Sequence, residues 1–402
     1  MKILMLLSKE WGESRSRREA AALVQAGHSV RVVARNRNRE ARLARSGRVV
    51  LCRIPSFRAL GRGFAQVASV PLPINPVWRL TVNRFARRWR PDVIHVHDLP
   101  LTPLAIALGH ELGARVVFDL HENYPAMMEV RGGGPIRRLA NHLRGWRELE
   151  RRVAKQTDAL LVVCDEQRER LERLGVDSRR IHVVGNTIEP EVLDQALAQS
   201  RTLEPPPLPP LPGLRVIYTG LFGRDRGLDV LIRALAIAVG HGADLSLLMV
   251  GDGMGMAQLR QLAAELQITA RVAFTGWIPY QQAFALIADS TIAVIPHRAD
   301  EHVNTTYPNK LFEFMGLSKP LVVSDALPLH RIVVRECGAG LSAPSGDAEA
   351  FAGALERLAA DPALREQLGR AGRRAVEGPY DFARDRARLL AMYDSLGRER
   401  PA

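Results

Sequence analysis

The sequence lacks the long apolar run that a membrane-spanning helix requires. No stretch of its 402 residues approaches the ~18 consecutive apolar residues that cross a bilayer. The opening run from Ile3 to Leu7 is too short for the apolar core of a signal peptide. It predicts a buried first strand instead. We therefore expect neither a membrane span nor a secretion signal.

Cysteine is scarce as well. Cys52, Cys164 and Cys337 lie far apart and form no pair at metal-ligand spacing, which excludes a disulfide framework and a structural zinc site. The chain also has no Asp-x-Asp pair, so no motif requires a divalent cation. We predict no metal and no other cofactor. Unpaired cysteines fit a reducing compartment, and we expect a cytoplasmic protein.

The remaining composition is that of an ordinary globular protein. Apolar residues make up 47% of the chain and charged residues 25%, which excludes a disordered or fibrous class. A length of 402 residues predicts two or three domains of roughly 150 residues each. Aromatic residues reach only 5% and no nucleic-acid motif accompanies the arginines, so we expect no nucleic-acid partner.

The net charge of +13 is confined to the first half of the chain. Residues 1–200 hold 34 Lys and Arg against 21 Asp and Glu, whereas the rest is balanced at 22 of each. This asymmetry indicates either an anionic partner, such as a membrane surface or a lipid-phosphate acceptor, or a solvated arginine-rich face. The apolar segment from Phe64 to Trp78 has basic neighbours. Two interpretations of it remain open, contact with a bilayer interface and packing on a sheet.

Short apolar runs alternate with segments of helical period along the chain, which is typical of β/α units around parallel sheets. We predict an α/β protein with two Rossmann-like, doubly wound domains that face a central cleft. The predicted strands cover residues 2–7, 29–34, 49–53, 93–96, 115–119, 159–164 and 181–184 in the first half, and 214–219, 245–251, 272–275, 292–296 and 320–324 in the second.

A proline-rich run interrupts this alternation at Arg201 to Gly213. Proline lacks an amide donor and fixes φ, so the run fits neither a helix nor a central strand. We predict a linker there. The predicted parts are an N-terminal domain over 1–200, the linker over 201–213, a second domain over 214–378, and a C-terminal helix within 379–402 that crosses back to the first domain.

Polar residues stand at the carboxyl ends of two neighbouring predicted strands, where an open α/β sheet binds its ligands. His97 and Asp98 end one strand, and His121 and Glu122 follow the next. Imidazole titrates near neutrality and hydrogen-bonds to hydroxyls in either protonation state. We therefore predict that this edge of the sheet recognises sugar hydroxyls and carries acid/base chemistry. His121 is the predicted catalytic residue, and His97, Asp98 and Glu122 are predicted contacts of a sugar or of the molecule that accepts it.

Three further positions in the first half carry weaker predictions. We expect His95 to be an interior histidine and Asp119 to be a turn residue. A polar loop from Ser8 to Ser16 follows the first strand, and its amides would offer an anion site where the strand meets the next helix. Gly12 lies inside this loop. We predict that it contacts a ligand there, either the acceptor molecule or a sugar.

The second half opens with a strand, a glycine-framed basic loop and the start of a helix. Gly220 permits a tight turn, and Arg224 or Arg226 is placed to hold a phosphate through paired hydrogen bonds. Gly251 follows the next strand in a Gly-x-Gly arrangement, which fits either a ligand contact or an ordinary turn. Gly220, Arg224, Arg226 and Gly251 are therefore predicted to bind a phosphate-bearing donor substrate.

The strongest local pattern is the loop and helix start from Asn309 to Glu313. The sequence predicts a short helix whose first amides, around Leu311 and Phe312, face the cleft with partial positive charge. Lys310 adds a full charge. Glu313 lies about one turn further along the same face, where a carboxylate accepts from two vicinal hydroxyls. A phosphate site with a ribose-binding acid beside it is the outline of a nucleotide-diphosphate site.

Taken together, the motifs resemble the family 4 retaining glycosyltransferases, which have the two-domain GT-B fold. The similarity covers nearly the whole chain and is carried by the segments Ala26 to Val30, Pro91 to Asp98, Asp119 to Glu122, Val184 to Asn186, Tyr218 to Gly227, Val250 to Gly253, Phe274 to Trp277 and Pro308 to Asp325. The resemblance implies transfer of a sugar from a UDP- or GDP-linked donor, without a metal and with retained anomeric configuration.

The resemblance also implies roles for single residues. Glu313 matches the second glutamate of the family's E-x7-E motif, which bonds the donor ribose. Arg226 stands where the family has a lysine that neutralises the donor diphosphate, and amides near Leu311 and Phe312 match diphosphate contacts. His121 matches the histidine placed against the transferred sugar.

The chain departs from the family pattern at two positions. The first glutamate of E-x7-E falls on Thr305, which we keep as a predicted sugar contact, and Glu301 is nearby but out of register. Leu221 replaces the arginine that usually follows the YxG glycine, so Arg224 or Lys310 is expected to supply its charge. Because a subset of the family shares the N-K-L-F-E helix start, both departures are interpreted as subfamily character.

The leading hypothesis is a retaining hexosyl- or N-acetylhexosaminyltransferase that acts in surface polysaccharide synthesis. Its partners would be a nucleotide sugar and a glycan or lipid-linked acceptor, with an anionic membrane surface as a further partner of the basic half. Catalysis would rest on His121, Arg226 and Lys310, the two cations stabilising negative charge on the departing phosphate. A UDP-sugar 2-epimerase of the same fold is the alternative, and a nucleic-acid-binding protein is a weaker one.

Overall fold

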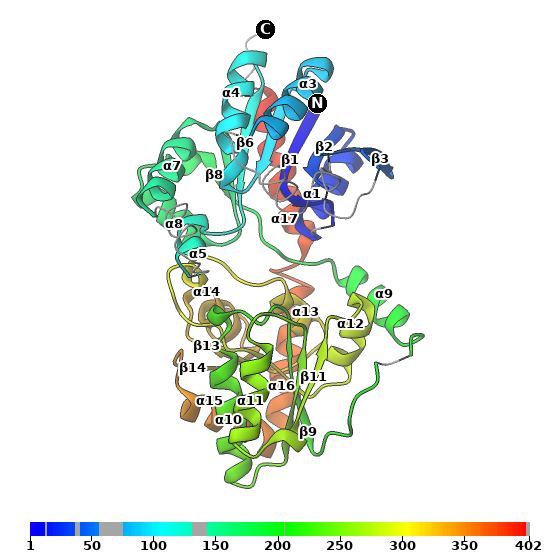
Figure 1. Ribbon diagram of the computed structural model, residues 1–402, viewed down its shortest axis with the longest axis vertical. Helices are drawn as coiled ribbons and strands as arrows, with labels where there is room; N and C mark the ends of the chain where they lie inside the picture. Colours follow the sequence, from blue (N-terminus) through cyan, green and yellow to red (C-terminus); the bar gives the residue numbers. More distant parts are fainter. Residues whose placement is uncertain (13, 37–40, 56–74, 131–142, 205, 399–402) are drawn as a thin grey trace. The chain divides into compact units, whose positions relative to one another are not determined.

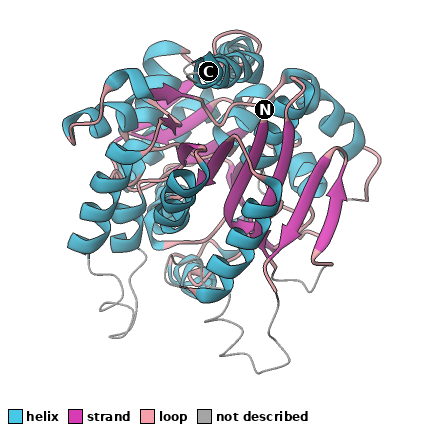
Figure 2. Cartoon of the chain, turned by 90° about the horizontal axis from the view of Figure 1, so that it is seen from above, coloured by secondary structure: helices cyan, strands magenta, loops and turns pink. Residues whose placement is uncertain are grey.

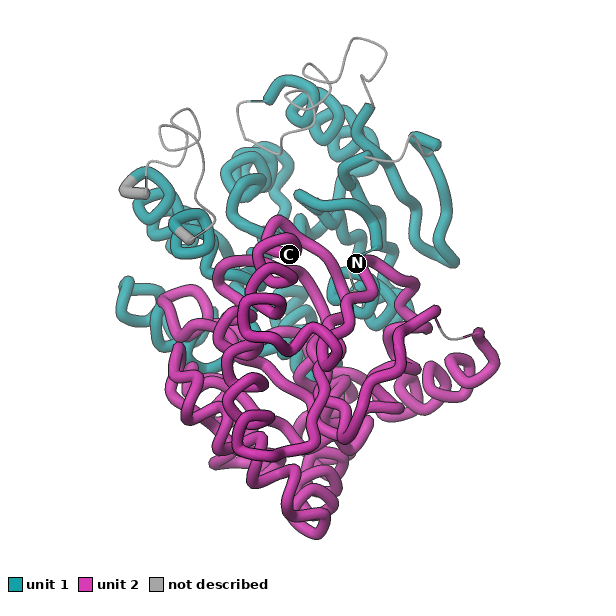
Figure 3. Tube along the Cα trace, turned by 60° about the horizontal axis from the view of Figure 1, so that its bottom comes forward, with its two compact units in different colours: residues 1–185, 385–402 teal, residues 186–384 magenta. Residues whose placement is uncertain are grey.

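The chain divides into two compact units in a computed structural model that describes all residues except 13, 37–40, 56–74, 131–142, 205 and 399–402. The first unit comprises residues 1–185 and 385–402, and the second comprises residues 186–384 (Figure 3). Each unit contains one sheet flanked by helices (Figures 1 and 2). Among the described residues, no helix combines the length and the apolar character that a bilayer span requires.

The first unit has an eight-stranded sheet in the order β3-β4-β2-β1-β5-β6-β7-β8. All neighbouring strands run parallel except β3, which is antiparallel to β4. The strands are β1 (Lys2–Glu10), β2 (Ser29–Arg35), β3 (Leu43–Ser46), β4 (Val49–Arg53), β5 (Val93–His97), β6 (Arg115–Leu120), β7 (Ala159–Val162) and β8 (Ile181–Val183).

Helices cover both faces of this sheet. Their bounds are α1 (Ser14–Gln25), α3 (Pro76–Trp89), η2 (Leu99–Leu101), α4 (Thr102–Leu112), α5 (Tyr124–Val130), α7 (Leu143–Gln156), α8 (Asp165–Arg173), η3 (Ser178–Arg180) and α17 (Phe382–Arg398). Alternate residues of β1 point to opposite faces. Ile3 and Met5 belong to the core cluster that contains residues of α1 and α17, whereas Leu4 and Leu6 belong to the cluster formed with α3 and α4. A strand buried on both faces is continuously apolar, as β1 is.

The second unit has a six-stranded parallel sheet in the order β11-β10-β9-β12-β13-β14. The strands are β9 (Leu214–Thr219), β10 (Leu245–Val250), β11 (Val272–Gly276), β12 (Ile292–Ile295), β13 (Leu321–Ser324) and β14 (Gly340–Ala343). The helices are α9 (Pro190–Ser200), η4 (Arg224–Arg226), α10 (Leu228–Gly240), α11 (Met256–Glu265), η5 (Thr269–Arg271), α12 (Tyr280–Ala288), η6 (Val303–Thr305), α13 (Lys310–Gly316), α14 (Leu327–His330), η7 (Arg331–Glu336), α15 (Ala348–Ala360) and α16 (Pro362–Val376).

Two α/β sheets, parallel throughout except for β3, confirm the predicted class of two doubly wound domains, and every predicted strand is present with small differences in its ends. The sequence analysis missed β3 and β14. Both are short edge strands, and β3 (LARS) and β14 (GLSA) contain too few apolar residues to stand out as buried strands.

The predicted end of the first domain at residue 200 is wrong, because α9 belongs to the second unit. Leu193 of α9 is fully buried, and a Cβ added to Gly316 would lie 2.2 Å from its Cδ1. Asp194 pairs with Arg373 of α16 at 2.8 Å. The proline-rich run therefore lies inside the second unit, where it joins α9 to β9 and does not link the two units.

The C-terminal segment from residue 385 belongs to the first unit. Leu389 and Met392 of α17 are buried in the same core cluster as α1, and the Tyr393 hydroxyl lies 2.8 Å from His95 Nδ1. Most of the segment from Phe64 to Trp78 lies outside the described residues. Its last residue, Trp78, is fully buried in α3.

Candidate active site

The carboxyl ends of β5 and β6 bring the predicted histidines of the first unit together. His97 is the last residue of β5 and pairs in register with Asp119 of β6. His121 follows β6 directly. Asp119 is therefore a strand residue, fully buried, and its prediction as a turn residue is wrong. His95 is an interior histidine as predicted, with no exposed surface.

Arg15 of α1 holds this cluster together. It donates two hydrogen bonds to the Asp119 carboxylate, from Nε at 3.0 Å and from Nη2 at 2.9 Å, and its Nε lies 3.0 Å from a carboxylate oxygen of Glu19. Its Nη1 donates to the carbonyl oxygens of Val184 and Gly185. Although burial acts to raise the pKa of Asp119, the charge of Arg15 holds it well below its usual value, so this carboxylate is ionised.

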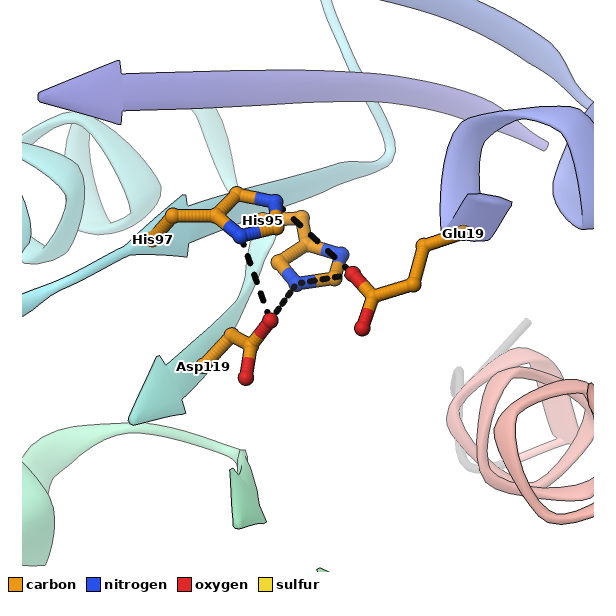
Figure 4. Close-up of side chains that lie close together, drawn as sticks. All are labelled: Glu19, His95, His97 and Asp119. Carbon is orange, nitrogen blue, oxygen red and sulfur yellow. Dashed lines mark ion pairs between the residues drawn. The ribbon is translucent and has the colours of Figure 1, made fainter. Parts of the chain in front are cut away.

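Glu19 faces the two histidines of β5 from the helix side (Figure 4). Its Oε2 lies 3.7 Å from His95 Nε2 and 3.8 Å from His97 Nε2. Burial raises the pKa of Glu19 to about 7, against the lowering effect of Arg15. This carboxyl group therefore titrates near neutral pH.

Glu19, His95, His97 and Asp119 each offer one ligand atom, and these atoms all lie within 4.8 Å of one another. Carboxylates and imidazoles are metal ligands. Here, however, the guanidinium group of Arg15 already contacts both carboxylates and supplies the positive charge that a cation would bring. The donor set therefore fits an ion-pair and hydrogen-bond network better than a metal centre.

His97 and His121 are in direct contact. His97 Nδ1 lies 2.9 Å from His121 Nε2, and the Asp119 Oδ2 atom is 3.1 Å from the first nitrogen and 3.3 Å from the second. Only 1% of His97 is exposed, against 5% of His121. The predicted contact of His97 with a sugar or acceptor is thus unavailable in this arrangement, because the ring is enclosed by its neighbours.

Asp98 lies at the more exposed edge of the cluster. It has φ 65° and ψ 156°, a conformation that is sparsely populated by residues other than glycine. Ser8 donates a hydrogen bond to its carboxylate at 3.1 Å, Lys9 Nζ lies 3.8 Å away, and His121 Nδ1 lies 3.9 Å away. Strain of this kind persists only where surrounding contacts enforce it, which supports the predicted functional role of Asp98.

The second unit brings Gly220 and Gly251 into backbone contact where β9 and β10 end. Both have positive φ, 126° and 131°, and a Cβ added to Gly251 would lie 1.9 Å from the Gly220 carbonyl oxygen. Only glycine fits such an approach. Gly251 therefore permits the turn at Gly220. Of the two roles predicted for Gly251, a ligand contact and an ordinary turn, the structure supports the turn.

Lys310 lies against the turn at Gly220. Lys310 Nζ donates a hydrogen bond to the Thr219 carbonyl oxygen at 2.5 Å, and a Cβ on Gly220 would lie 3.3 Å from the same Nζ. Burial and the charge of Arg226 hold the pKa of Lys310 well below its usual value. An anion bound here would relieve that repulsion.

Arg226 is positioned by its own loop and by a buried histidine. Its Nε lies 3.2 Å from Asp225 Oδ2, and its Nη1 lies 3.3 Å from His297 Nδ1. Burial, together with the charges of Arg226 and Lys310, holds the pKa of His297 well below its usual value, so this imidazole is neutral. Arg224, the other predicted phosphate ligand, is an exposed side chain of η4.

Glu313 lies on α13 one turn after Lys310. Its Oε1 accepts a hydrogen bond from the Tyr280 hydroxyl at 3.0 Å. Asn309 precedes the helix and is exposed. The carboxylate and the two cations therefore stand on neighbouring elements of one unit, as the sequence analysis predicts.

Several predicted contacts are not available as proposed. The Leu311 amide donates to the Pro308 carbonyl oxygen at 3.1 Å and the Phe312 amide donates to the Asn309 carbonyl oxygen at 3.2 Å, so neither amide is free for a phosphate. Thr305 is buried, and its hydroxyl donates to the backbone carbonyls of Glu301 and His302. That hydroxyl stabilises the local turn.

Two other predicted contacts are weakly supported. The polar loop after the first strand is shorter than expected, because β1 continues to Glu10 and α1 begins at Ser14. Gly12 lies in the remaining turn, exposed, and a Cβ there would meet no atom within 4 Å. Glu122 is half-buried after His121.

Sequence reasoning missed Arg15, Glu19 and His297. The first two are separated from Asp119 by about a hundred residues along the chain, so no local spacing reveals the pairing. The start of α1 has three arginines and one glutamate within five residues, and such a charged run indicates a solvated face by default. His297 follows β12, and its position at a strand's carboxyl end was the one signal that pointed to it.

Both units match known glycosyltransferase domains. Residues 12–187 match the Glycosyl transferase 4-like domain, and residues 213–361 match the Glycosyl transferases group 1 domain. The fold is similar to that of sucrose-phosphate synthase from Thermosynechococcus elongatus, with a TM-score of 0.77 and 19% identity over 100% of both chains. It is also similar to HepE from Anabaena in complex with UDP, with a TM-score of 0.70 and 14% identity over 98% of this chain and 100% of that one.

These findings define a two-unit glycosyltransferase of the GT-B fold. The chain belongs to the group 1 glycosyltransferases, which confirms the family and the GT-B fold inferred from its motifs. Alpha-D-kanosaminyltransferase from Streptomyces kanamyceticus is 22% identical over 299 residues, 71% of this chain and 72% of that protein. The lipopolysaccharide core biosynthesis glycosyltransferase LpsE from Rhizobium meliloti is 27% identical over 304 residues, 75% of each chain.

Proposed function

We propose that this glycosyltransferase moves a sugar from a UDP- or GDP-linked donor to a glycan or lipid-linked acceptor, with retention of anomeric configuration. The observation that supports the donor most is the position of Lys310 at the Gly220 turn, within reach of the charge of Arg226. Because the charge of Arg226 disfavours protonation of Lys310, the two side chains fit a ligand with two negative phosphates. HepE, which has been crystallised in complex with UDP, supports a nucleotide in the same kind of fold.

The second unit would hold the donor by its diphosphate and its ribose. Lys310 and Arg226 bind the phosphate oxygens, and His297, neutral and buried beside Arg226, supports that side chain without adding charge. Glu313 accepts hydrogen bonds from two ribose hydroxyls, and Tyr280 holds its carboxylate until the ribose arrives. No metal ion is part of this proposal, because the two side chains supply the cationic charge.

In the proposed reaction the bond between the anomeric carbon and the diphosphate oxygen breaks as the acceptor oxygen bonds to the same face of that carbon. The acceptor hydroxyl gives its proton to the departing phosphate. Because negative charge accumulates on that phosphate in the transition state, Lys310 and Arg226 stabilise it, an effect worth ~3–4 kcal/mol for each donor group removed. His121, with Asp98 beside it, contacts the transferred sugar.

The acceptor is proposed to be part of a surface glycan. LpsE is a glycosyltransferase of lipopolysaccharide core biosynthesis, which supports this acceptor class. An anionic membrane surface is a further proposed partner. Helix α3 exposes Arg79, Leu80, Arg84 and Arg88 on its solvent side, and basic residues around an apolar side chain favour an anionic bilayer. A peripheral, cytoplasmic location would follow.

A thermal-shift screen with UDP, GDP, ADP and their sugars tests the donor site. A ligand at ~100 times its dissociation constant adds about 2.7 kcal/mol of stability. We expect UDP or GDP to raise the melting temperature and Glu313→Ala to abolish the rise. Glu349→Ala, which removes an exposed carboxylate from α15, is the matched control and should keep it. An equal rise in Glu313→Ala would remove Glu313 from the site.

The reaction itself needs separate tests. NMR of the product formed on a glycan acceptor reports the anomeric configuration, and inversion would overturn the retaining mechanism. Incubation with UDP-GlcNAc alone distinguishes the epimerase, because an epimerase needs no acceptor. Sedimentation with vesicles of phosphatidylglycerol, compared with vesicles of phosphatidylcholine, tests the membrane partner. Equal binding to both would exclude the electrostatic contact.

A further inference from the structure

His97 has no role in the proposed reaction. Its ring is nevertheless enclosed by two carboxyl groups and two further histidine rings, those of Glu19, Asp119, His95 and His121. It stacks on His95 with ring centroids 4.5 Å apart, and its two nitrogens face Asp119 and Glu19. It also meets His121 edge to face, with centroids 5.1 Å apart. A buried polar ring in contact with the residue assigned to the sugar has a chemical task beyond packing.

His97 carries one ring proton at neutral pH. Burial, together with the neighbouring charge of His95, lowers the pKa of His97 to about 4, although its hydrogen bond to Asp119 acts in the opposite direction. A neutral imidazole is a donor at one nitrogen and an acceptor at the other. The nitrogen that carries this single proton therefore determines whether His97 presents a hydrogen-bond donor or an acceptor to His121.

The proton belongs on Nδ1 of His97. The Asp119 carboxylate lies 3.1 Å from this nitrogen and, being ionised, only accepts hydrogen bonds. The other nitrogen, Nε2, lies 3.8 Å from Glu19 and makes no hydrogen bond. Placing the proton there would bury a donor without an acceptor, which is more costly than an unbonded lone pair.

His121 must then accept at the nitrogen that faces His97. His97 Nδ1 and His121 Nε2 are 2.9 Å apart, too close for two N–H groups pointing at each other. With Nε2 as an acceptor of the His97 proton, the N–H of His121 resides on Nδ1. That atom faces the Asp98 carboxylate at 3.9 Å, on the side of the cluster with more exposure, and an N–H is favoured next to a carboxylate.

We propose that His97 is a positioning residue that fixes His121 in the Nδ1–H form, so that His121 meets a sugar hydroxyl as a hydrogen-bond donor. The contact with sugar rests on the proposed function, whereas the position of the proton does not. Asp119 acts one step further back, since its carboxylate orients His97. Arg15 in turn holds that carboxylate in place.

The position of the proton can be read directly by NMR. In full-length protein labelled with 15N-histidine, two-bond 1H–15N correlations distinguish Nδ1–H from Nε2–H rings. The spectrum of His121→Asn identifies the His121 signals by their loss. We expect the Nδ1–H pattern for His121 in the wild type. In His97→Ala the Asp119 carboxylate becomes the nearest partner of His121 Nε2, so the pattern should change to Nε2–H.

Kinetics provide the second readout. We expect His97→Ala to lower kcat by ~10–100-fold, the range seen when a residue that orients a functional histidine is lost. KM for the nucleotide sugar should stay within about twofold, because the proposed contacts with the diphosphate and the ribose lie on the second unit. His97→Asn places an amide N–H near the position of Nδ1 and should restore most of the activity. His110→Ala, at an exposed histidine of α4, is the matched control.

The outcomes separate the two proposals. If the wild type transfers no sugar but shows the Nδ1–H pattern that His97→Ala reverses, the proposed function fails and the proton assignment stands. An Nε2–H pattern for His121 in the wild type overturns the inference, whatever the activity. So does an unchanged pattern in His97→Ala with native circular dichroism, or a His97→Asn variant no more active than His97→Ala.

Discussion

Lys310 of α13 donates a hydrogen bond to the carbonyl oxygen of Thr219 at the end of β9, over 2.5 Å. The same ammonium group lies 3.7 Å from the centre of the Tyr218 ring. Both contacts hold the cation beside Gly220, although burial and Arg226 act against its charge. The lysine is therefore fixed in place before any ligand arrives, in a position that favours an anion.

Binding of UDP should be accompanied by proton uptake at Lys310. In the free protein its pKa is well below the usual value, and a diphosphate beside it would raise that pKa. The protein then binds a proton together with the nucleotide. Calorimetry at about pH 8.5, in buffers with different ionisation enthalpies, measures this uptake, and UDP is already fully ionised there because its last phosphate pKa is about 6.

Lys310→Arg is the matched control for this measurement. Guanidinium groups stay protonated throughout this range, so the variant should bind UDP with no proton uptake. Uptake that is as large in the arginine variant as in the wild type would assign the proton to another group, and His297 would be the next residue to test.

The grouping of the proposed donor-site residues on one unit could be predicted from the sequence, because they are close in sequence to turns and helix starts. Lys310 and Glu313 share one short helix, and Arg226 follows a glycine turn. The buried network of the first unit could not be predicted in the same way. Arg15 meets Asp119 only because β1, β5 and β6 are neighbours in the sheet, and strand order is not written in local spacing.

Gly251→Ala should disrupt the donor site through the backbone. A Cβ at this position would lie 1.9 Å from the Gly220 carbonyl oxygen, and the φ of 131° is unfavourable for alanine. We expect a loss of about 1–3 kcal/mol of stability from backbone strain and at least a tenfold weaker affinity for UDP. Denaturant titration and calorimetry measure the two effects.

Gly353→Ala is the control for that substitution. It lies within α15 with no atom within 4 Å of an added Cβ, so alanine should stabilise the protein by roughly 0.5–1 kcal/mol through its better helix propensity. If Gly251→Ala binds UDP with wild-type affinity, the turn tolerates the methyl group. The close approach of Gly251 to the Gly220 carbonyl oxygen would then not be required for UDP binding.

Glu19 should make stability depend on pH between about pH 5 and pH 8. Its pKa is raised from 4.5 to about 7 in the folded protein, so its stabilising contribution is present below 4.5 and is lost as the pH rises through 7. Glu19→Gln removes this dependence. The melting temperature of the variant relative to the wild type should therefore rise with pH, and a difference that is flat or falls would contradict the raised pKa.

Removing Arg15 should cost far more than removing an exposed arginine. Arg15→Met leaves the Asp119 carboxylate buried without its partner, a change worth about 3–5 kcal/mol. The double variant Arg15→Met with Asp119→Asn removes the unpaired charge and should recover part of that loss. Arg87→Met breaks the exposed pair with Glu111 and should cost far less, because solvent and salt screen an exposed ion pair. Denaturant unfolding measures all three, and equal losses in Arg15→Met and Arg87→Met would show that the buried network does not depend on this guanidinium group.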